Sequence, residues 1–323
     1  MTAIFIIPQL PLNSRYTSFI HRGIAEQIRK MGQDVEVLTL KREPVKVLTT
    51  YFTNEPEAIK YETRQILELH DIVQKGDKVL WMDLDFPGFS VPMAYYLKRK
   101  GVLNYGIIHG AYFNEGDYWQ GIDRKNFMRA EIDVCEKVFV GSEYFANRLI
   151  SILGSEYSQK IKVTGLPFEK SYYENLKQLA FVTKKENLIY SPNKEIEIEG
   201  FEVWGKEKLP HDEFLKKLAR TKFALIFKKA ETFGYTVLEA LALNVMTIVP
   251  SDFSYIEFSK KVGVPSFLNL ELCFESAINY INYMKDFLYK DEEDTSRRAN
   301  SLSPLFMWLF GSSRRIAEEV VED

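Results

Sequence analysis

Short apolar segments alternate with longer amphipathic segments along most of the chain. Apolar residues 3–7 predict a buried strand, residues 16–31 have the periodicity of a helix that ends at Gly32, and residues 35–40 predict a second strand. Strand, helix and strand within so short a span are typical of the start of a doubly wound parallel sheet. The alternation continues with strands expected at residues 79–82, 105–108, 138–140 and 161–163, and with helices expected at residues 58–74, 91–100, 126–135 and 143–153.

The alternation restarts after a polar stretch at residues 171–183, which we expect to be a connector. Beyond it, strands are expected at residues 188–190, 201–204, 223–227 and 246–249, and helices at residues 212–220, 235–243, 274–288 and 303–322. The chain therefore predicts an α/β fold of two Rossmann-like, doubly wound domains that face a central cleft. We place the first domain at residues 1–170, the second at residues 171–302 and a separate C-terminal helix at residues 303–323.

The segment Lys222–Asp252 carries the most informative chemistry. Glu239 lies on a helical run whose other residues are nearly all apolar, where a carboxylate is costly unless a polar group satisfies it. Glu231 lies eight residues earlier, in the loop before the helix, whose first backbone N–H groups form an anion site. Gly234 has no Cβ, so the backbone there can approach a ligand closely. Two carboxylates beside an anion site suit a ligand with hydroxyl groups at both ends and phosphate between them, such as a nucleotide sugar.

The run Glu231-Thr-Phe-Gly-Tyr-Thr-Val-Leu-Glu239-Ala-Leu-Ala resembles the E-x7-E motif of retaining GT-B glycosyltransferases, in particular the GT4-like family (glycosyl transferases group 1). This resemblance implies a compact hexosyltransferase that uses a UDP- or GDP-sugar as co-substrate, retains anomeric configuration and needs no metal or other cofactor. It also implies that Glu231 binds hydroxyl groups of the donor sugar and that Glu239 binds the ribose. The backbone that would face phosphate or sugar belongs to Thr232, Phe233, Gly234 and Tyr235. The final helix resembles one that, in the family, often crosses back to the first domain.

The positions of three of the four histidines on the predicted helices and strands indicate whether each could belong to a site. His109 follows a predicted strand, and the carboxyl ends of strands are where α/β sheets bind ligands. Many members of the GT4-like family have a histidine over the donor sugar at a similar strand end, so His109 joins Glu231 as a catalytic candidate. A capping or core role for His109 stays open. We expect His21, which lies beside Arg22 on the first helix, to be exposed and His211 to begin a helix.

The chain departs from the GT4-like pattern at the residues that neutralise the diphosphate. The family usually has an arginine and then Lys-Gly after the first strand of the second domain, whereas this chain reads Leu188-Ile-Tyr-Ser-Pro-Asn-Lys194-Glu. Lys194 is the first candidate for the missing cation, and Lys228 and Lys229 are the next. Without such a cation, the alternative is a non-catalytic nucleotide-sugar or glycan-binding protein that has kept a degenerate GT-B site.

Composition and charge narrow the partners further. A net charge of −3 with dispersed lysines and arginines makes nucleic acid an unlikely partner. The two cysteines, Cys135 and Cys273, have no metal-ligand spacing, which favours a reduced, cytoplasmic setting. Asp83 and Asp85 have the D-x-D spacing of a metal site in a different glycosyltransferase fold, but we expect them to cap a turn or line an acceptor cleft. No apolar run is long enough to span a membrane, and peripheral membrane contact stays open, as does the acceptor (glycan, lipid or small molecule).

Overall fold

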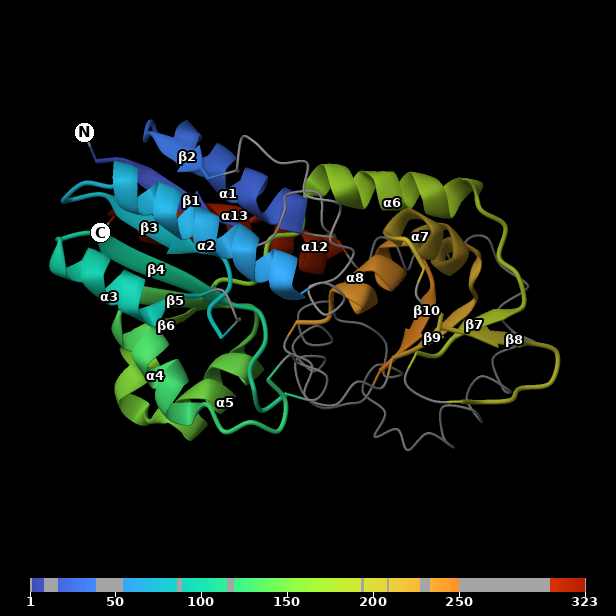
Figure 1. Ribbon diagram of the computed structural model, residues 1–323. Coiled ribbons are helices and arrows are strands. Elements are labelled where there is room, and N and C mark those ends of the chain that lie inside the picture. The colour runs from blue at the N-terminus through green and yellow to red at the C-terminus, as the bar shows by residue number, and fades with distance from the viewer. Residues whose placement is uncertain are drawn as a thin grey trace. The chain divides into compact units, whose positions relative to one another are not determined.

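The computed structural model describes residues 2–8, 17–38, 55–85, 89–114, 119–192, 195–207, 209–226, 233–249 and 303–322. The chain divides into two compact units, each with its own parallel sheet and covering helices (Figure 1). Unit 1 comprises Met1–Glu169 together with Leu309–Asp323, and unit 2 comprises Lys170–Trp308.

Unit 1 is built on a six-stranded sheet in the order β2-β1-β3-β4-β5-β6, in which every neighbouring pair is parallel. The six predicted strands are confirmed as β1 (Ile4–Ile7), β2 (Val35–Val37), β3 (Lys78–Trp81), β4 (Leu103–Ile108), β5 (Lys137–Val140) and β6 (Ile161–Val163). The chain adds β2 on one side of β1 and β3 on the other, so the sheet changes its direction of growth there. In open α/β sheets, ligands bind outside the carboxyl ends of the strands at such a switch point.

The helices of unit 1 also lie close to their predicted positions. They are α1 (Thr17–Lys30), α2 (Glu55–Ile72), α3 (Val91–Arg99), α4 (Lys125–Asp133) and α5 (Glu143–Leu153), followed by a short 3-10 helix at Ser155–Gln159. The single helix that we expected over residues 303–322 is wrong in one respect. It consists of two helices, α12 (Ser303–Phe310) and α13 (Ser312–Glu322), with Gly311 between them.

Helix α13 is part of unit 1 because it packs against α1 and the first sheet. A Cβ added to Gly23 of α1 would lie 2.7 Å from Ser313 Oγ, so the absence of a side chain allows the two helices to approach. Arg315 donates from Nη2 to the carbonyl oxygen of Thr164 at 2.7 Å. The ammonium group of Lys78 donates to two backbone carbonyls in the last turn of α13, at 2.8 and 2.9 Å. The lysine contacts join the last turn of α13 to the amino end of β3, and the Arg315 contact joins the helix to the residue after β6.

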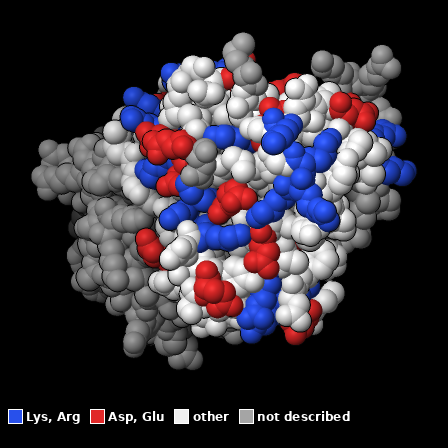
Figure 2. All heavy atoms as spheres, turned by 90° about the vertical axis from the view of Figure 1, so that its left-hand side faces the viewer, with Lys and Arg blue, Asp and Glu red and all other residues white. Residues whose placement is uncertain are grey.

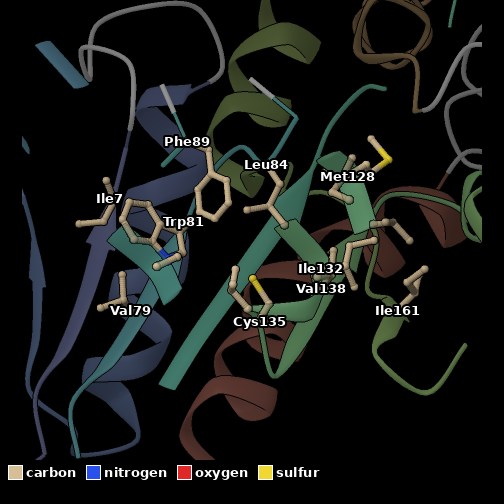
Figure 3. Close-up of a cluster of buried hydrophobic side chains, with 14 of the residues drawn as sticks. Ile7, Val79, Trp81, Leu84, Phe89, Met128, Ile132, Cys135, Val138 and Ile161 are labelled. Carbon is tan, nitrogen blue, oxygen red and sulfur yellow. The ribbon is translucent and has the colours of Figure 1, made fainter. Parts of the chain in front are cut away.

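A large part of the core of unit 1 is one cluster of apolar side chains, some of which are shown in Figure 3. Trp81 is fully buried and meets the edge of the Phe89 ring with centroids 5.1 Å apart. Its indole N–H donates to Asn104 Oδ1 at 3.0 Å, which satisfies the polar atom of an otherwise apolar side chain. The carboxyl end of β3 is therefore held rigidly at the place where the following loop begins.

The loop after β3 is anchored by Leu84. A Cβ on Gly106, in the middle of β4, would lie only 2.4 Å from Leu84 Cδ1, so a strand residue with a side chain would displace the leucine. Leu84 points into the core beside Phe89 (Figure 3). This packing fixes the residues on either side of Leu84, which are Asp83 and Asp85.

Unit 2 has a smaller parallel sheet in the order β10-β9-β7-β8. Its strands are β7 (Leu188–Tyr190), β8 (Glu202–Trp204), β9 (Phe223–Leu225) and β10 (Met246–Ile248), and its described helices are α6 (Lys170–Val182), α7 (His211–Arg220) and α8 (Tyr235–Ala242). The expected connector at residues 171–183 is wrong, because α6 occupies it and buries Tyr173 and Leu176. The predicted helix at residues 274–288 lies outside the described residues.

The face of unit 1 that lies at the left of Figure 1 carries charges of both signs. Figure 2 shows lysine and arginine side chains interspersed with aspartate and glutamate across it. Ion pairs within unit 1 include Lys98 with Glu136 at 3.2 Å and Lys137 with Glu319 at 3.0 Å. Mixed charges of this kind give no extended field of one sign over the part of this face that the structure describes.

Candidate functional site

His109 is the first residue beyond β4, at the carboxyl edge of the sheet of unit 1. Its side chain is 20% exposed, and its Nδ1 lies 4.0 Å from Asp83 Oδ2. Burial lowers the pKa of His109 to about 4, so its ring is neutral around pH 7. A neutral imidazole offers one N–H donor and one acceptor nitrogen, the combination that a hydroxyl group can match. The role of His109 toward a sugar stays a prediction, and its position and charge suit it.

The expectation that His21 is exposed is wrong, because its side chain is almost fully buried in unit 1. His21 belongs to the inward stripe of α1 with Ile24, Ala25 and Ile28, at helical spacings that the sequence already shows. Burial lowers the pKa of His21 to about 3, and the nearby charges of His109 and Arg22 lower it further. Neither ring nitrogen of His21 has a hydrogen-bond partner among the described residues.

Acidification is expected to destabilise the protein through these two histidines. An unfolded histidine has a pKa near 6.5, whereas His21 and His109 have lowered pKa values in the folded state. Their stabilising contribution is thus complete above about pH 6.5 and is lost as the pH falls, by up to about 1.4 kcal/mol per pH unit for each histidine. Urea unfolding between about pH 7 and pH 5 measures this slope. A free energy of unfolding that is flat over this range contradicts the prediction.

Asp85 and Glu131 are buried carboxylates that share one guanidinium group. Asp85 Oδ1 accepts a hydrogen bond from Arg124 Nε at 2.9 Å, and Glu131 Oε1 accepts one from Arg124 Nη2 at 3.2 Å. The other oxygen of Asp85 accepts from the backbone N–H of Tyr112 at 2.7 Å, and the other oxygen of Glu131 accepts from the backbone N–H of Asp85 at 3.1 Å. Asp85 has a φ of 39°, a left-handed conformation that these bonds hold in place.

Asp85 therefore serves the architecture of unit 1. Both carboxylate oxygens of Asp85 are engaged by protein groups, and the bond to Tyr112 ties the loop after β3 to the loop after β4. Within the described ranges, no group of three histidine, cysteine, aspartate or glutamate side chains is arranged to hold a metal ion. The two roles that we expected of Asp83 and Asp85, capping a turn or lining an acceptor cleft, stay predictions.

The amino end of α8 forms the first part of the site in unit 2. Gly234 is the N-cap, with a φ of 84° and a ψ of 51°, a left-handed conformation that favours glycine. The first N–H groups of any helix have no acceptor within the helix and carry its positive dipole end, which suits an anion. The side chains of Phe233 and Tyr235 are buried and meet edge to face at 5.0 Å. These two residues can therefore offer a ligand mainly their backbone; the contact of that backbone with phosphate or sugar stays a prediction.

Glu239 lies one helical turn further along α8 and is 2% exposed. Tyr172 on α6 donates its hydroxyl hydrogen to Glu239 Oε1 at 2.7 Å. His211 on α7 lies with Nε2 3.0 Å from the Tyr172 hydroxyl and 3.4 Å from the same carboxylate oxygen. The three helices α6, α7 and α8 thus bring one side chain each to a single polar cluster. This cluster supplies polar partners for a carboxylate whose position on an apolar helix was the main oddity of the sequence.

Tyr172 was missed by the sequence analysis because its segment was interpreted as a connector. His211 is confirmed as the first residue of α7, but its partnership with Glu239 was not foreseen. Tyr172 and Glu239 are 67 positions apart, and no local pattern links them. The remaining predicted site residues lie outside the described residues; they are Glu231, Thr232, Lys194, Lys228 and Lys229.

Comparison with known proteins identifies solved structures that have a similar fold. No protein-family model and no curated protein matches the chain. Among solved structures, the catalytic domain of starch synthase IV from Arabidopsis thaliana, bound to ADP and acarbose, is similar with a TM-score of 0.64 and 12% identity over 100% of this chain and 99% of that one. A trehalose-6-phosphate synthase studied for glycosyl transfer with retention is similar with a TM-score of 0.56 and 8% identity, over 99% and 98%. The N-terminal domain of a Candida albicans trehalose-6-phosphate phosphatase gives 0.55 and 10%, over 99% and 96%.

These similarities, together with two parallel sheets covered by helices, show that the chain has the GT-B fold of two Rossmann-like domains. The predicted fold class is confirmed. Among the described residues, no helix is both long enough and apolar enough to cross a membrane.

Proposed function

We propose that this protein is a glycosyltransferase that moves a hexose from a nucleotide-sugar donor to an acceptor hydroxyl group, with retention of anomeric configuration and without a divalent metal. The observation that carries the proposal is the buried Glu239 carboxylate, one turn beyond the glycine-capped start of α8 in a chain with the GT-B fold. Neighbours of that fold include a starch synthase bound to ADP and a synthase studied for transfer with retention.

Unit 2 binds the nucleotide in this proposal. Glu239 accepts hydrogen bonds from the ribose hydroxyl groups, and Tyr172 and His211 orient it. The backbone N–H groups at the start of α8 meet the diphosphate, whose charge grows as it departs. Glu231 contacts hydroxyl groups of the donor sugar. Lys194 or Lys229 supplies the positive charge that an arginine and the lysine of Lys-Gly usually provide in the GT4-like family.

In this proposal, the neutral ring of His109 bonds a hydroxyl group of the transferred sugar. In the reaction, the bond between the anomeric carbon and the phosphate oxygen breaks while the acceptor oxygen forms the new bond on the same face. The acceptor proton passes to the departing phosphate. The work of the protein is to position the reactants and to stabilise the leaving group. A cytoplasmic setting belongs to the proposal, because the chain has only two cysteines and Cys135 is a buried free thiol.

A second function, non-catalytic binding of a nucleotide sugar or glycan, is favoured by two observations. The sequence lacks the arginine and Lys-Gly that the GT4-like pattern would place after residues 188–190. The same fold also occurs in a domain of a protein named as a phosphatase, so the fold alone does not require transfer. A binding protein of this kind would bind donor and release no product.

The two functions predict different outcomes with a panel of UDP-, GDP- and ADP-sugars. One donor is expected to raise the melting temperature, because a ligand that binds only the folded state stabilises it. That donor should then be hydrolysed slowly without acceptor, with release of the nucleoside diphosphate. EDTA should not change the rate. Binding without release over many hours favours the binding protein. Loss of activity with EDTA that manganese restores contradicts metal independence. If none of these donors binds, the result contradicts both transfer from them and binding of them as nucleotide sugars.

A further inference from the structure

His21 has chemistry that the proposed function does not use. It is a polar side chain with 1% of its surface exposed, and both its nitrogens lack a hydrogen-bond partner among the described residues. Burying a polar group without a partner costs free energy, and an apolar side chain would fit the inward stripe of α1 without that cost. The presence of a histidine here would be explained if a bound ligand supplied the hydrogen-bond partner that the ring lacks in the free protein.

The topology places His21 at the ligand-binding edge of unit 1. Helix α1 follows β1 and packs back along a parallel sheet, so its first turns lie at the carboxyl ends of the strands. His109 begins the loop after β4 at the same edge. The charge of a protonated His109 lowers the pKa of His21, which shows that the two rings lie within electrostatic reach of each other.

The chemistry of the two rings selects the class of ligand. Each neutral imidazole has one donor and one acceptor, and a hydroxyl group likewise donates and accepts. A phosphate would be better served by cations, and no third metal ligand joins the two histidines among the described residues. A sugar ring carries several neighbouring hydroxyl groups, so two imidazoles can bind one ring at two points.

We propose that His21 is a second sugar-binding residue, which acts with His109 to bind hydroxyl groups of the donor's sugar ring. This inference rests on the proposed function, because the sugar is the one that the nucleotide brings. It adds a residue outside the E-x7-E segment to those that determine which sugar is accepted.

Histidine-selective ¹⁵N NMR of the full chain tests the proposal directly. The chain has only four histidines, so single substitutions assign every ring. With the sugar nucleotide that raises the melting temperature (UDP-glucose, ADP-glucose or GDP-mannose), the ring signals of His21 are expected to shift. With the matching nucleoside diphosphate, which has no sugar, they should stay in place. The His211 ring should respond to both ligands, because it contacts the proposed ribose-binding carboxylate.

A substitution gives an independent readout. His21→Leu removes no hydrogen bond that the described structure contains, so the melting temperature without ligand should be equal to or higher than that of the parent. The dissociation constant for the sugar nucleotide should rise at least about ten-fold, as for a lost hydrogen bond to a ligand, while that for the nucleoside diphosphate stays within about two-fold. His70→Leu is the matched control, since His70 is exposed and pairs with Asp71; both dissociation constants should be unchanged.

The outcomes separate this inference from the proposed function. Shifts at His211 with both ligands, but an unmoved His21 ring and unchanged affinities in His21→Leu, would overturn the role of His21 and keep the nucleotide site. An unmoved His211 ring and no binding of any sugar nucleotide would overturn the proposed function and this inference together. If His21→Leu does not fold, the NMR experiment on the parent chain still decides.

Discussion

Replacing Glu239 with alanine is expected to weaken the binding of a nucleoside diphosphate by about 10- to 150-fold. The proposed role of Glu239 is to accept hydrogen bonds from ribose, and a hydrogen bond to a charged group contributes about 1.5–3 kcal/mol. Isothermal titration calorimetry with UDP, GDP and ADP measures the change, and the same loss should appear with the sugar nucleotide because the nucleotide part is common to both. The affinity for a free sugar should not change.

Two further variants show whether such a loss comes from the ligand or from the fold. Glu239→Gln keeps an oxygen that can accept from Tyr172 and keeps the volume of the side chain, so it should fold normally while still binding nucleotide more weakly. Tyr172→Phe removes the 2.7 Å hydrogen bond to Glu239 but keeps the ring against His211, and it should weaken nucleotide binding less than Glu239→Ala does. Wild-type affinity in a folded Glu239→Ala protein would exclude Glu239 as the ribose-binding group.

Replacing Arg124 with methionine is expected to lower the free energy of unfolding by about 3–5 kcal/mol at neutral pH, the usual cost of removing one partner from a buried ion pair. Arg124 is the shared guanidinium partner of Asp85 and Glu131 and also lies over the rings of Trp119 and Phe127 at 4.2 and 4.3 Å. Without it, the buried side chains of Asp85 and Glu131 both lose the hydrogen-bond donor that they share. Urea unfolding measures the loss, and the same change at exposed Arg314, which pairs one turn away with Glu318, should cost far less.

The pH dependence of this cluster follows from the pKa of Glu131. Burial raises that pKa well above its usual range, the neighbouring Asp85 raises it further, and Arg124 opposes both effects. The folded state therefore holds the proton more firmly than the unfolded state does. The stabilising contribution is full below the ordinary glutamate pKa and is lost as the pH rises through the raised pKa. Glu131→Gln cannot lose this proton, so its stability relative to the parent should rise as the pH increases above the ordinary glutamate pKa. Parallel pH profiles for the two proteins would contradict this.

The sequence predicts the central strands of unit 1 well because β1, β3, β4 and β5 are short, mainly apolar runs that are almost entirely buried, as is typical of a parallel sheet covered by helices. Helix α6 was not predicted because its apolar residues lack a regular pattern. It buries Tyr173 and Leu176 but leaves Phe181 and Val182 more than 80% exposed, so its apolar residues do not form one stripe.

The candidate site likewise contains residues that can be predicted from the sequence and contacts that cannot. Gly234 and Glu239 can be found from sequence because they lie in one continuous segment that alternates strand, loop and helix. The hydrogen bonds from Tyr172, and the shared guanidinium of Arg124, join segments that only the fold brings together. His21 was misjudged for a local reason, since its neighbour Arg22 was taken as a sign of exposure although the spacing to Ile24 and Ile28 places it on the buried side.

The docking of α13 on α1 has a consequence for the order of synthesis. The ribosome makes α13 after all of unit 2, yet Ile316, Ala317 and Val320 of this helix are buried within unit 1. While unit 2 is being translated, the nascent unit 1 must wait with the surface around Gly23 uncovered and the ammonium group of Lys78 without the two carbonyls that receive it. The unit whose residues emerge first is thus the one completed last, and a chaperone that shields this surface of α1 would act throughout the translation of unit 2.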